Sequence, residues 1–277
     1  NDHFQVIHIP NGPHTPLPKK EILTALPEFT QNIADYMRVN HLSYEVIHGH
    51  YYLSGLVAKQ LNAANHTQTP LIMTFHTLGL MKQLVTRAKD TDDPLQRIPI
   101  EHDLAKYASG LITSSDTGKE YLAALYDADD KKIITIPPGV DTALFRNIPM
   151  PEAKKRISAN PTHHIVLAVG RIDPVKGFDV LLMALKMLLR RRTDLSDTLC
   201  LWIVGGDIGQ HMDQWSRELK KLDQLRKTLN LTAAVKFVAA QPQEKLPYYY
   251  NAADVLVMPS HYESFGMVAL EAIACGT

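Results

Sequence analysis

The chain has 277 residues, enough for roughly two domains at ~150 residues each. Its 45% hydrophobic and 21% charged content is that of a globular protein, which excludes a disordered, collagen-like or coiled-coil chain. Lysine and arginine number 29, and so do aspartate and glutamate, so the sequence lacks the basic excess that usually accompanies a nucleic-acid or anionic-membrane partner.

The chain alternates short β-branched segments with stretches in which apolar residues recur at helical spacing. In the first half we predict strands at residues 5–10, 45–50, 70–76, 110–115 and 132–139, and helices at 29–39, 53–64, 95–109 and 117–126. In the second half we predict strands at 164–170, 198–206, 234–240 and 255–260, and helices at 178–192, 211–230, 244–253 and 266–276. Strands this apolar are typical of parallel sheets covered by helices on both faces. The sequence therefore predicts an α/β protein with doubly wound parallel sheets.

Residues 145–164 interrupt this alternation with three prolines and clustered charge. We place the domain boundary there and predict two Rossmann-like domains, residues 1–146 and 164–277, joined by a linker at 147–163. The chain begins near a strand without a preceding βα unit and stops just after a helix. We therefore expect an internal piece of a longer protein, with both domains incomplete at the chain ends.

The two cysteines, Cys200 and Cys275, are too few for a disulfide framework or a cysteine-rich metal site. Two reduced thiols in apolar segments favour a cytoplasmic protein. Apolar runs such as residues 181–189 fall short of the ~18 residues that a membrane helix needs, so we expect no transmembrane segment.

In doubly wound sheets, ligands bind beyond the carboxyl ends of the strands. Arg171 and Lys176 follow the predicted strand 164–170 and precede a helix. Two cations beside a helix N-terminus suit a diphosphate, because the helix end offers N–H donors and arginine adds bidentate hydrogen bonds. A solvated basic loop is the alternative interpretation.

Gly205 and Gly206 end the next predicted strand, where glycine allows either a close backbone approach to a ligand or a plain tight turn. The pattern G-x-G-x-x-G is absent, which disfavours a nicotinamide dinucleotide and an oxidoreductase that uses it.

Glu263 and Glu271 lie eight residues apart after the predicted strand 255–260, and Gly266 opens the helix between them. The N–H groups around Phe265 to Val268 should point at whatever binds there. Glu271 lies among apolar residues and must reach a polar partner, for which ribose or sugar hydroxyls would serve. The alternative is one acidic residue favoured by the helix dipole and one buried glutamate with a structural partner.

Histidines follow two consecutive strands of the first half, His48 and His50 after one and His76 after the next, with Lys82 further on. Two consecutive strands with histidine at their ends favour a site over a structural role. A metal fits poorly, because no cysteine joins the histidines and no His-x3-His pair lies on a helix.

Three stretches together resemble the retaining glycosyltransferases of family 4, which have the GT-B fold. They are VGRIDPVKG (169–177), the Gly205–Gly206 turn and MPSHYESFGMVALEAIACGT (258–277), which contains the family's Glu-x7-Glu pattern. PPGVDTALF (137–145) is similar to the stretch that closes the family's N-terminal domain. IPNGP, HGHYYLSG and FHTLGLMK resemble the branch that holds sucrose-phosphate synthase, sucrose synthase and D-inositol 3-phosphate glycosyltransferase.

The resemblance implies a nucleotide-sugar donor, commonly UDP-linked as in UDP-glucose, with no required metal or other cofactor. It implies that Arg171 and Lys176 hold the donor diphosphate, that Glu263 binds hydroxyls of the transferred sugar and that His76 hydrogen-bonds the same sugar. Four residues are thereby expected in catalysis: His76, Arg171, Lys176 and Glu263. The remaining donor contacts are expected from Gly205, Gly206, Phe265, Gly266, Met267, Val268 and, on the ribose, Glu271.

Relatives with phosphorylated acceptors hold that phosphate with basic residues of the N-terminal domain. The candidates here are Lys82 and Arg97, with Lys19 or Lys20 as a further possibility, and Tyr51 and Thr77 match positions near the acceptor. The alternative is that Lys82 and Arg97 are two surface cations.

The resemblance thus implies a retaining hexosyltransferase with a small-molecule donor and acceptor and without a nucleic-acid partner. A relative that binds a nucleotide or sugar without transfer is the alternative. The family's glycine-rich loop is expected to precede Asn1, and the rest of the C-terminal domain to follow Thr277. We therefore expect the chain alone to lack part of the machinery for activity.

Overall fold

The computed structural model describes residues 4–12, 15, 17, 21–85, 93–208, 213 and 215–277. The chain divides into two compact units, residues 1–137 and 138–277, each with its own sheet.

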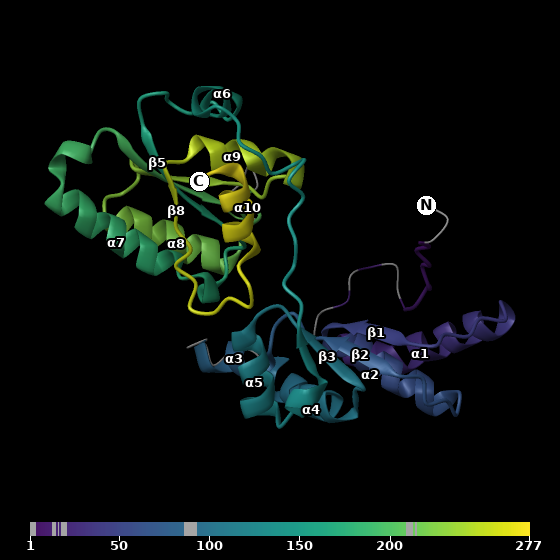
Figure 1. Cartoon of the computed structure of the whole chain (residues 1–277). Coiled ribbons are helices and arrows are strands. Elements are labelled where there is room, and N and C mark those ends of the chain that lie inside the picture. The colour runs from purple at the N-terminus through teal and green to yellow at the C-terminus, as the bar shows by residue number, and fades with distance from the viewer. Residues whose placement is uncertain are drawn as a thin grey trace. The chain divides into compact units, whose positions relative to one another are not determined.

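The first unit is built on a parallel sheet in the order β1-β2-β3-β4. Figure 1 labels its first three strands. Sequential order means that each strand pairs with the next one along the chain, so helices form the crossovers. The elements are α1 (Ile22–Val39), β1 (Ile47–His50), α2 (Tyr51–Ala64), β2 (Leu71–Thr74), α3 (Gly79–Val85), α4 (Asp93–Tyr107), β3 (Gly110–Thr113), α5 (Asp116–Tyr126) and β4 (Ile133–Thr135).

The second unit holds a parallel sheet in the order β7-β6-β5-β8. The strand order reverses between β5 and β8, and such a reversal is where open α/β sheets bind ligands. The elements are α6 (Met150–Arg156), β5 (His164–Val169), α7 (Phe178–Arg191), β6 (Leu199–Val204), α8 (Arg217–Thr228), β7 (Val235–Val238), α9 (Leu246–Ala252), β8 (Val255–Leu256) and α10 (Met267–Cys275).

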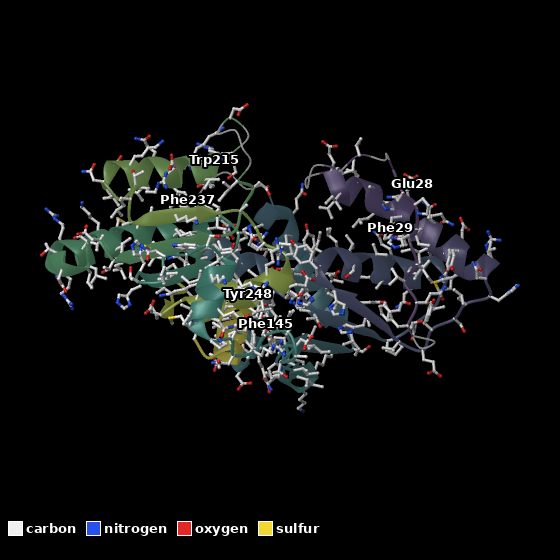
Figure 2. All side chains as sticks on the ribbon, turned by 90° about the horizontal axis from the view of Figure 1, so that it is seen from above. Glu28, Phe29, Phe145, Trp215, Phe237 and Tyr248 are labelled. Carbon is white, nitrogen blue, oxygen red and sulfur yellow. The ribbon has the colours of Figure 1, made fainter. Side chains whose placement is uncertain are left out.

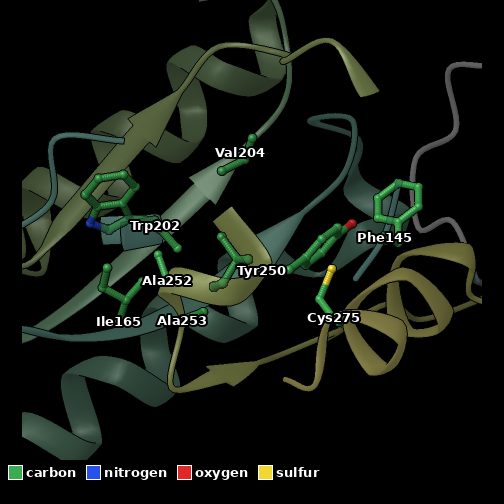
Figure 3. Close-up of a cluster of buried hydrophobic side chains, with 11 residues drawn as sticks. Phe145, Ile165, Trp202, Val204, Tyr250, Ala252, Ala253 and Cys275 are labelled. Atoms are coloured by element: carbon green, nitrogen blue, oxygen red, sulfur yellow. The ribbon is translucent and has the colours of Figure 1, made fainter. Parts of the chain in front are cut away.

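The central strand β6 of the second sheet is buried on both faces, as its continuous apolar run predicts. On β6, Trp202 and Val204 join one apolar cluster with Phe145 and Tyr250 (Figure 3), whereas Leu201 packs into the cluster beneath α7. Phe237, labelled in Figure 2, lies on the edge strand β7. Arg226 of α8 covers its ring, 4.9 Å from the ring centroid. The expectation of two parallel-sheet α/β domains is confirmed.

The predicted strand at residues 5–10 is wrong. Residues 4–12 contain no strand, and Phe4 and Val6 are 75% and 62% exposed. The segment is tied instead to α1 by side-chain amides: Asn32 donates to the Pro10 carbonyl, and Asn11 to that of Ala25, each at 3.0 Å. β-branched composition alone forms no strand when the backbone has no neighbouring strand to pair with.

Two helices, α3 and α6, are absent from the sequence-based assignment. Residues 147–163, expected as a linker, contain α6 and belong to the second unit. Pro149 caps α6 and Pro151 lies in its first turn, where a missing N–H costs nothing.

Of the predicted helix 211–230, the structure describes α8, while residues 211, 212 and 214 lie outside the described part.

Glycine permits the close approach of loops at the carboxyl edge of the second sheet. A Cβ on Gly205, whose φ is +142°, would lie 1.9 Å from the carbonyl oxygen of Gly170. A Cβ on Gly177, at φ +63°, would lie 2.2 Å from the carbonyl oxygen of Pro259. The loops after β5, β6 and β8 therefore meet backbone to backbone. Any side chain larger than hydrogen at Gly177 or Gly205 would prevent this approach.

We expect Gly205→Ala to destabilise the chain by about 2–4 kcal/mol, because it adds both backbone strain and overlap with the Gly170 carbonyl. Gly139→Ala is the matched control, since a Cβ at Gly139 meets nothing within 4 Å. Urea unfolding of both variants measures the difference. Equal stability of the two variants would contradict this account of the edge.

Candidate functional site

The loop after β5 brings Lys176 to Glu263, although the two are far apart in the sequence. Asp173 accepts a hydrogen bond from the N–H of Val175 at 3.0 Å and so caps the short 3-10 turn that ends at Lys176. The Lys176 ammonium donates to Oε2 of Glu263 at 2.6 Å, with the two side chains 19% and 30% exposed. Arg171, in the same loop, is exposed. The loop thus offers two cations within reach of a ligand, one of them paired with a carboxylate.

The loop after β8 leads to the N-terminus of α10. It is joined to the first loop where the His261 N–H donates to the Val175 carbonyl at 2.8 Å. Gly266, at φ +95°, is the N-cap of α10 and has no side chain with which to cap it. The N–H groups of Met267 and Val268 in the first turn therefore suit an external anion.

Other residues predicted to contact the nucleotide-sugar donor lie at the same edge of the sheet. Phe265 and Val268 are half-buried, and Met267 is exposed. Gly206, which follows Gly205, accepts a hydrogen bond from the N–H of Ala240 at 3.1 Å. Because parallel strands end on one side of the sheet, these residues share the edge that carries Lys176 and Glu263.

Glu271 is buried in α10, as its apolar surroundings predict, at 8% exposed. Its polar partner is the hydroxyl of Tyr250 on α9, which donates to Oε2 at 2.6 Å. Burial, together with the adjacent Glu271 carboxylate, raises the pKa of Tyr250 well above its usual value, so the phenol keeps its proton. Sequence analysis missed this tyrosine, one of three consecutive tyrosines with no pattern to single it out.

In the first unit, Tyr51, Thr77 and Arg97 come together. The Arg97 guanidinium donates to the Tyr51 hydroxyl at 3.2 Å, to Oγ1 of Thr77 at 3.0 Å and also to the Thr77 carbonyl. It also lies over the Tyr51 ring, 4.7 Å from the centroid. Arg97 is 2% exposed, so the alternative of a surface cation is wrong for it.

The two hydroxyls accept hydrogen bonds from Arg97 and keep their own protons to donate. Lys82 is half-buried on the neighbouring helix α3, and no contact from its ammonium to the other three is found in the described part of the chain. Lys19 and Lys20 lie outside the described residues.

Glu101 and Tyr126 complete this cluster, and sequence analysis missed both. Glu101 is fully buried; its Oε1 accepts from Nε of Arg97 at 2.5 Å, and its Oε2 accepts from the N–H of Gly79 at 2.8 Å. Tyr126 donates to the same Oε2 at 2.6 Å and accepts from the N–H of Leu80 at 3.0 Å. One carboxylate therefore holds the arginine and the start of α3 together.

The three predicted histidines also come together, although His48 and His50 lie within β1 rather than after it, and only His76 follows its strand, β2. Nδ1 of His50 lies 2.9 Å from Nε2 of His76, and Nε2 of His48 lies 2.9 Å from Oγ1 of Thr74. Burial, followed by the neighbouring His50, lowers the pKa of both His48 and His76, so their rings are neutral at neutral pH. His76 also has φ +60°, which turns the chain sharply after β2.

Within the described ranges, no group of three or more histidine, cysteine or acidic side chains is arranged to hold a metal ion. Over the same residues, no helix combines the length and the apolar character that crossing a membrane requires.

Two family models match the chain. The model described as Glycosyltransferase Family 4 matches residues 1–144, and the one described as Glycosyl transferases group 1 matches residues 149–277.

The chain is 38% identical over 268 residues to a D-inositol 3-phosphate glycosyltransferase of Acidothermus cellulolyticus, covering 96% of this chain and 58% of that protein. It is 36% identical over 274 residues to that of Actinosynnema mirum, covering 99% and 64%. The chain spans about three fifths of the length of these curated relatives.

Among solved structures, a sucrose-phosphate synthase from Thermosynechococcus elongatus is similar with a TM-score of 0.84 and 30% identity over 100% of this chain and 65% of that one. Anabaena HepE in complex with UDP and glucose is similar with a TM-score of 0.69 and 20% identity over 95% and 64%. The second likeness shows the fold alone.

We expect Glu101→Gln to destabilise the chain by about 3–5 kcal/mol, because it leaves the buried Arg97 charge without a counter-charge. Asp103→Asn, two residues on in α4, breaks an exposed pair with Lys59 and should cost about 1 kcal/mol or less. Urea unfolding measures both variants. Equal losses would show that the buried pair has no special role.

Proposed function

The chain belongs to glycosyltransferase family 4. We propose that the protein transfers a hexosyl group from a nucleotide sugar to a hydroxyl of a phosphorylated polyol or sugar, with retention of the anomeric configuration. The observation that carries the proposal is the carboxyl edge of the second sheet, where Lys176 meets Glu263 beside the open N-terminus of α10.

This edge suits a nucleoside diphosphate that carries a sugar. Arg171 and Lys176 supply two positive charges, and the first turn of α10 supplies N–H donors for the diphosphate. Glu263 then has a second use, since it can leave Lys176 and accept hydrogen bonds from sugar hydroxyls. The buried Glu271 is the proposed ligand of the ribose hydroxyls.

The proposed transfer proceeds on one face of the sugar. The bond between the anomeric carbon and the diphosphate oxygen breaks, and the acceptor oxygen bonds to the same carbon from the same side. The acceptor proton goes to the departing phosphate oxygen, so no carboxylate acts as a covalent nucleophile. Arg171 and Lys176 stabilise the negative charge that grows on the leaving group. Such electrostatic stabilisation of the transition state is usually the largest single contribution to catalysis.

The proposed acceptor phosphate binds at Tyr51, Thr77 and Arg97, with Lys82 as a further cation. The two hydroxyl protons can be donated to phosphate oxygens, and the buried Arg97 guanidinium behind them holds both hydroxyls and adds positive charge. Relatives named D-inositol 3-phosphate glycosyltransferase and a sucrose-phosphate synthase support a phosphorylated acceptor or product. His76, beside His50, is the proposed contact to the transferred sugar.

The proposed donor is UDP-linked, as is common in the branch that the sequence resembles. No metal or other cofactor enters the proposal, because the cations at the edge of the second sheet can balance the diphosphate charge.

We expect Arg171→Ala and Lys176→Ala each to weaken the binding of a nucleoside diphosphate by about tenfold or more, because each removes a charge-assisted hydrogen bond. Arg190→Ala, which removes an exposed cation from the last turn of α7, is the control and should bind normally. Calorimetric titration with UDP, GDP and ADP in parallel measures the loss of affinity and shows which nucleotide base the site prefers. Near-normal binding by the Lys176→Ala variant would remove that residue from the donor site.

We expect Tyr51→Phe and Thr77→Val each to weaken the binding of inositol 3-phosphate by about five- to tenfold, because each removes one hydroxyl donor. Unphosphorylated inositol and UDP should bind these variants as they bind the unchanged chain. Tyr44→Phe, at an exposed tyrosine of the same unit, is the control. Unchanged preference for the phosphorylated ligand would place the acceptor phosphate elsewhere.

A further inference from the structure

Tyr250 contacts a proposed ligand-binding residue but is itself out of reach of any ligand. It is fully buried on α9, inside the apolar cluster of Figure 3, and its hydroxyl donates to Oε2 of Glu271 at 2.6 Å. Because the whole Tyr250 residue is 0% exposed, its hydroxyl cannot touch a nucleotide. Whatever Tyr250 contributes to binding must therefore pass through the carboxylate of Glu271.

The surroundings of Tyr250 fix where its hydroxyl points. Its ring packs against Phe145, with centroids 6.1 Å apart and an interplanar angle of 57°. Its carbonyl oxygen accepts hydrogen bonds from the N–H of Ala253 at 3.0 Å and from Oγ1 of Thr277 at 2.8 Å. Ring and backbone are thus held on several sides, so the donor direction toward Glu271 is set by packing.

The hydrogen bond also assigns different tasks to the two oxygens of Glu271. Oε2 receives the tyrosine proton, which satisfies one side of a carboxylate that is otherwise costly to bury. Among the described residues Oε1 has no hydrogen-bond partner, so it is the oxygen left for a ligand. A carboxylate fixed at one oxygen presents the other in one direction, as selection among ligands by a single hydroxyl requires.

We propose that Tyr250 is a positioning residue that orients the Glu271 carboxylate toward the ribose hydroxyls and thereby sets the preference of the site for ribonucleotides over deoxyribonucleotides. This inference rests on the proposed function, because it takes Glu271 as the ribose ligand. Tyr250 would then determine selectivity for the ribose of the nucleotide although it lies wholly in the core.

The experiment compares Tyr250→Phe with Tyr249→Phe in the 277-residue chain. Both changes remove one phenolic oxygen from the same helix, but Tyr249 packs against Trp202, and in the described part of the chain no hydrogen bond joins it to Glu271. Calorimetry gives the affinity for the nucleoside diphosphate that binds best and for its 2′-deoxy and 3′-deoxy counterparts. The ratio of ribo to deoxy affinity is the readout, because a general loss of stability weakens all three ligands alike.

We expect Tyr250→Phe to lower this ratio by about three- to tenfold and Tyr249→Phe to leave it unchanged. Glu271→Gln, which keeps the buried tyrosine and its ring, should also lower the ratio. In the Glu271→Gln background, Tyr250→Phe should lower it no further, because the tyrosine acts through that carboxylate.

If Tyr250→Phe has the same ratio of ribo to deoxy affinity as the unchanged chain, the inference is overturned, but the proposed donor site is not affected. A full ratio in Glu271→Gln does the same, and this variant decides the matter if Tyr250→Phe fails to fold. Failure of the folded, unchanged chain to bind any nucleoside diphosphate overturns the proposed donor site and the inference with it.

Discussion

The close backbone approach at Gly177 and Gly205 is the constraint on which the second unit's candidate site depends. Where these glycines meet the carbonyls of Pro259 and Gly170, three loops from separate strands are brought into direct contact. Only then can Lys176, which follows β5, reach Glu263, which follows β8. The parallel sheet sets the edge at which these loops gather, and glycine sets how near they come.

The two units organise their polar residues in the same way, with a buried tyrosine donating to a buried carboxylate at 2.6 Å. In the first unit the pair is Tyr126 and Glu101, and in the second it is Tyr250 and Glu271. Glu101 uses its other oxygen to hold Arg97, whereas among the described residues no partner of the other Glu271 oxygen is found. A hydrogen bond from a buried tyrosine restricts the orientation of a buried carboxylate, which suits the carboxylate either to hold another residue or to meet a ligand itself.

Sequence patterns predicted what depends on periodicity and local chemistry. Apolar runs located the buried strands. Glu271 was expected to need a polar partner, and the partner found, Tyr250, is a structural one of the kind that the alternative interpretation named. The strand at residues 5–10 failed because pairing depends on a neighbour that composition does not reveal. The helix α6 was missed because Pro149 and Pro151 are breakers inside a helix but harmless at its start. Partners such as Glu101 and Tyr250 are set by tertiary packing, so no spacing in the sequence identifies them.

The most direct test of the central claim is a crystal structure of the chain with UDP bound, since the claim concerns where the diphosphate lies. We expect the diphosphate to lie against Arg171, Lys176 and the first turn of α10, with Lys176 no longer bound to Glu263 alone. It predicts the ribose hydroxyls on Glu271. A diphosphate bound at the Arg97 cluster, or a ribose that does not contact Glu271, would contradict it.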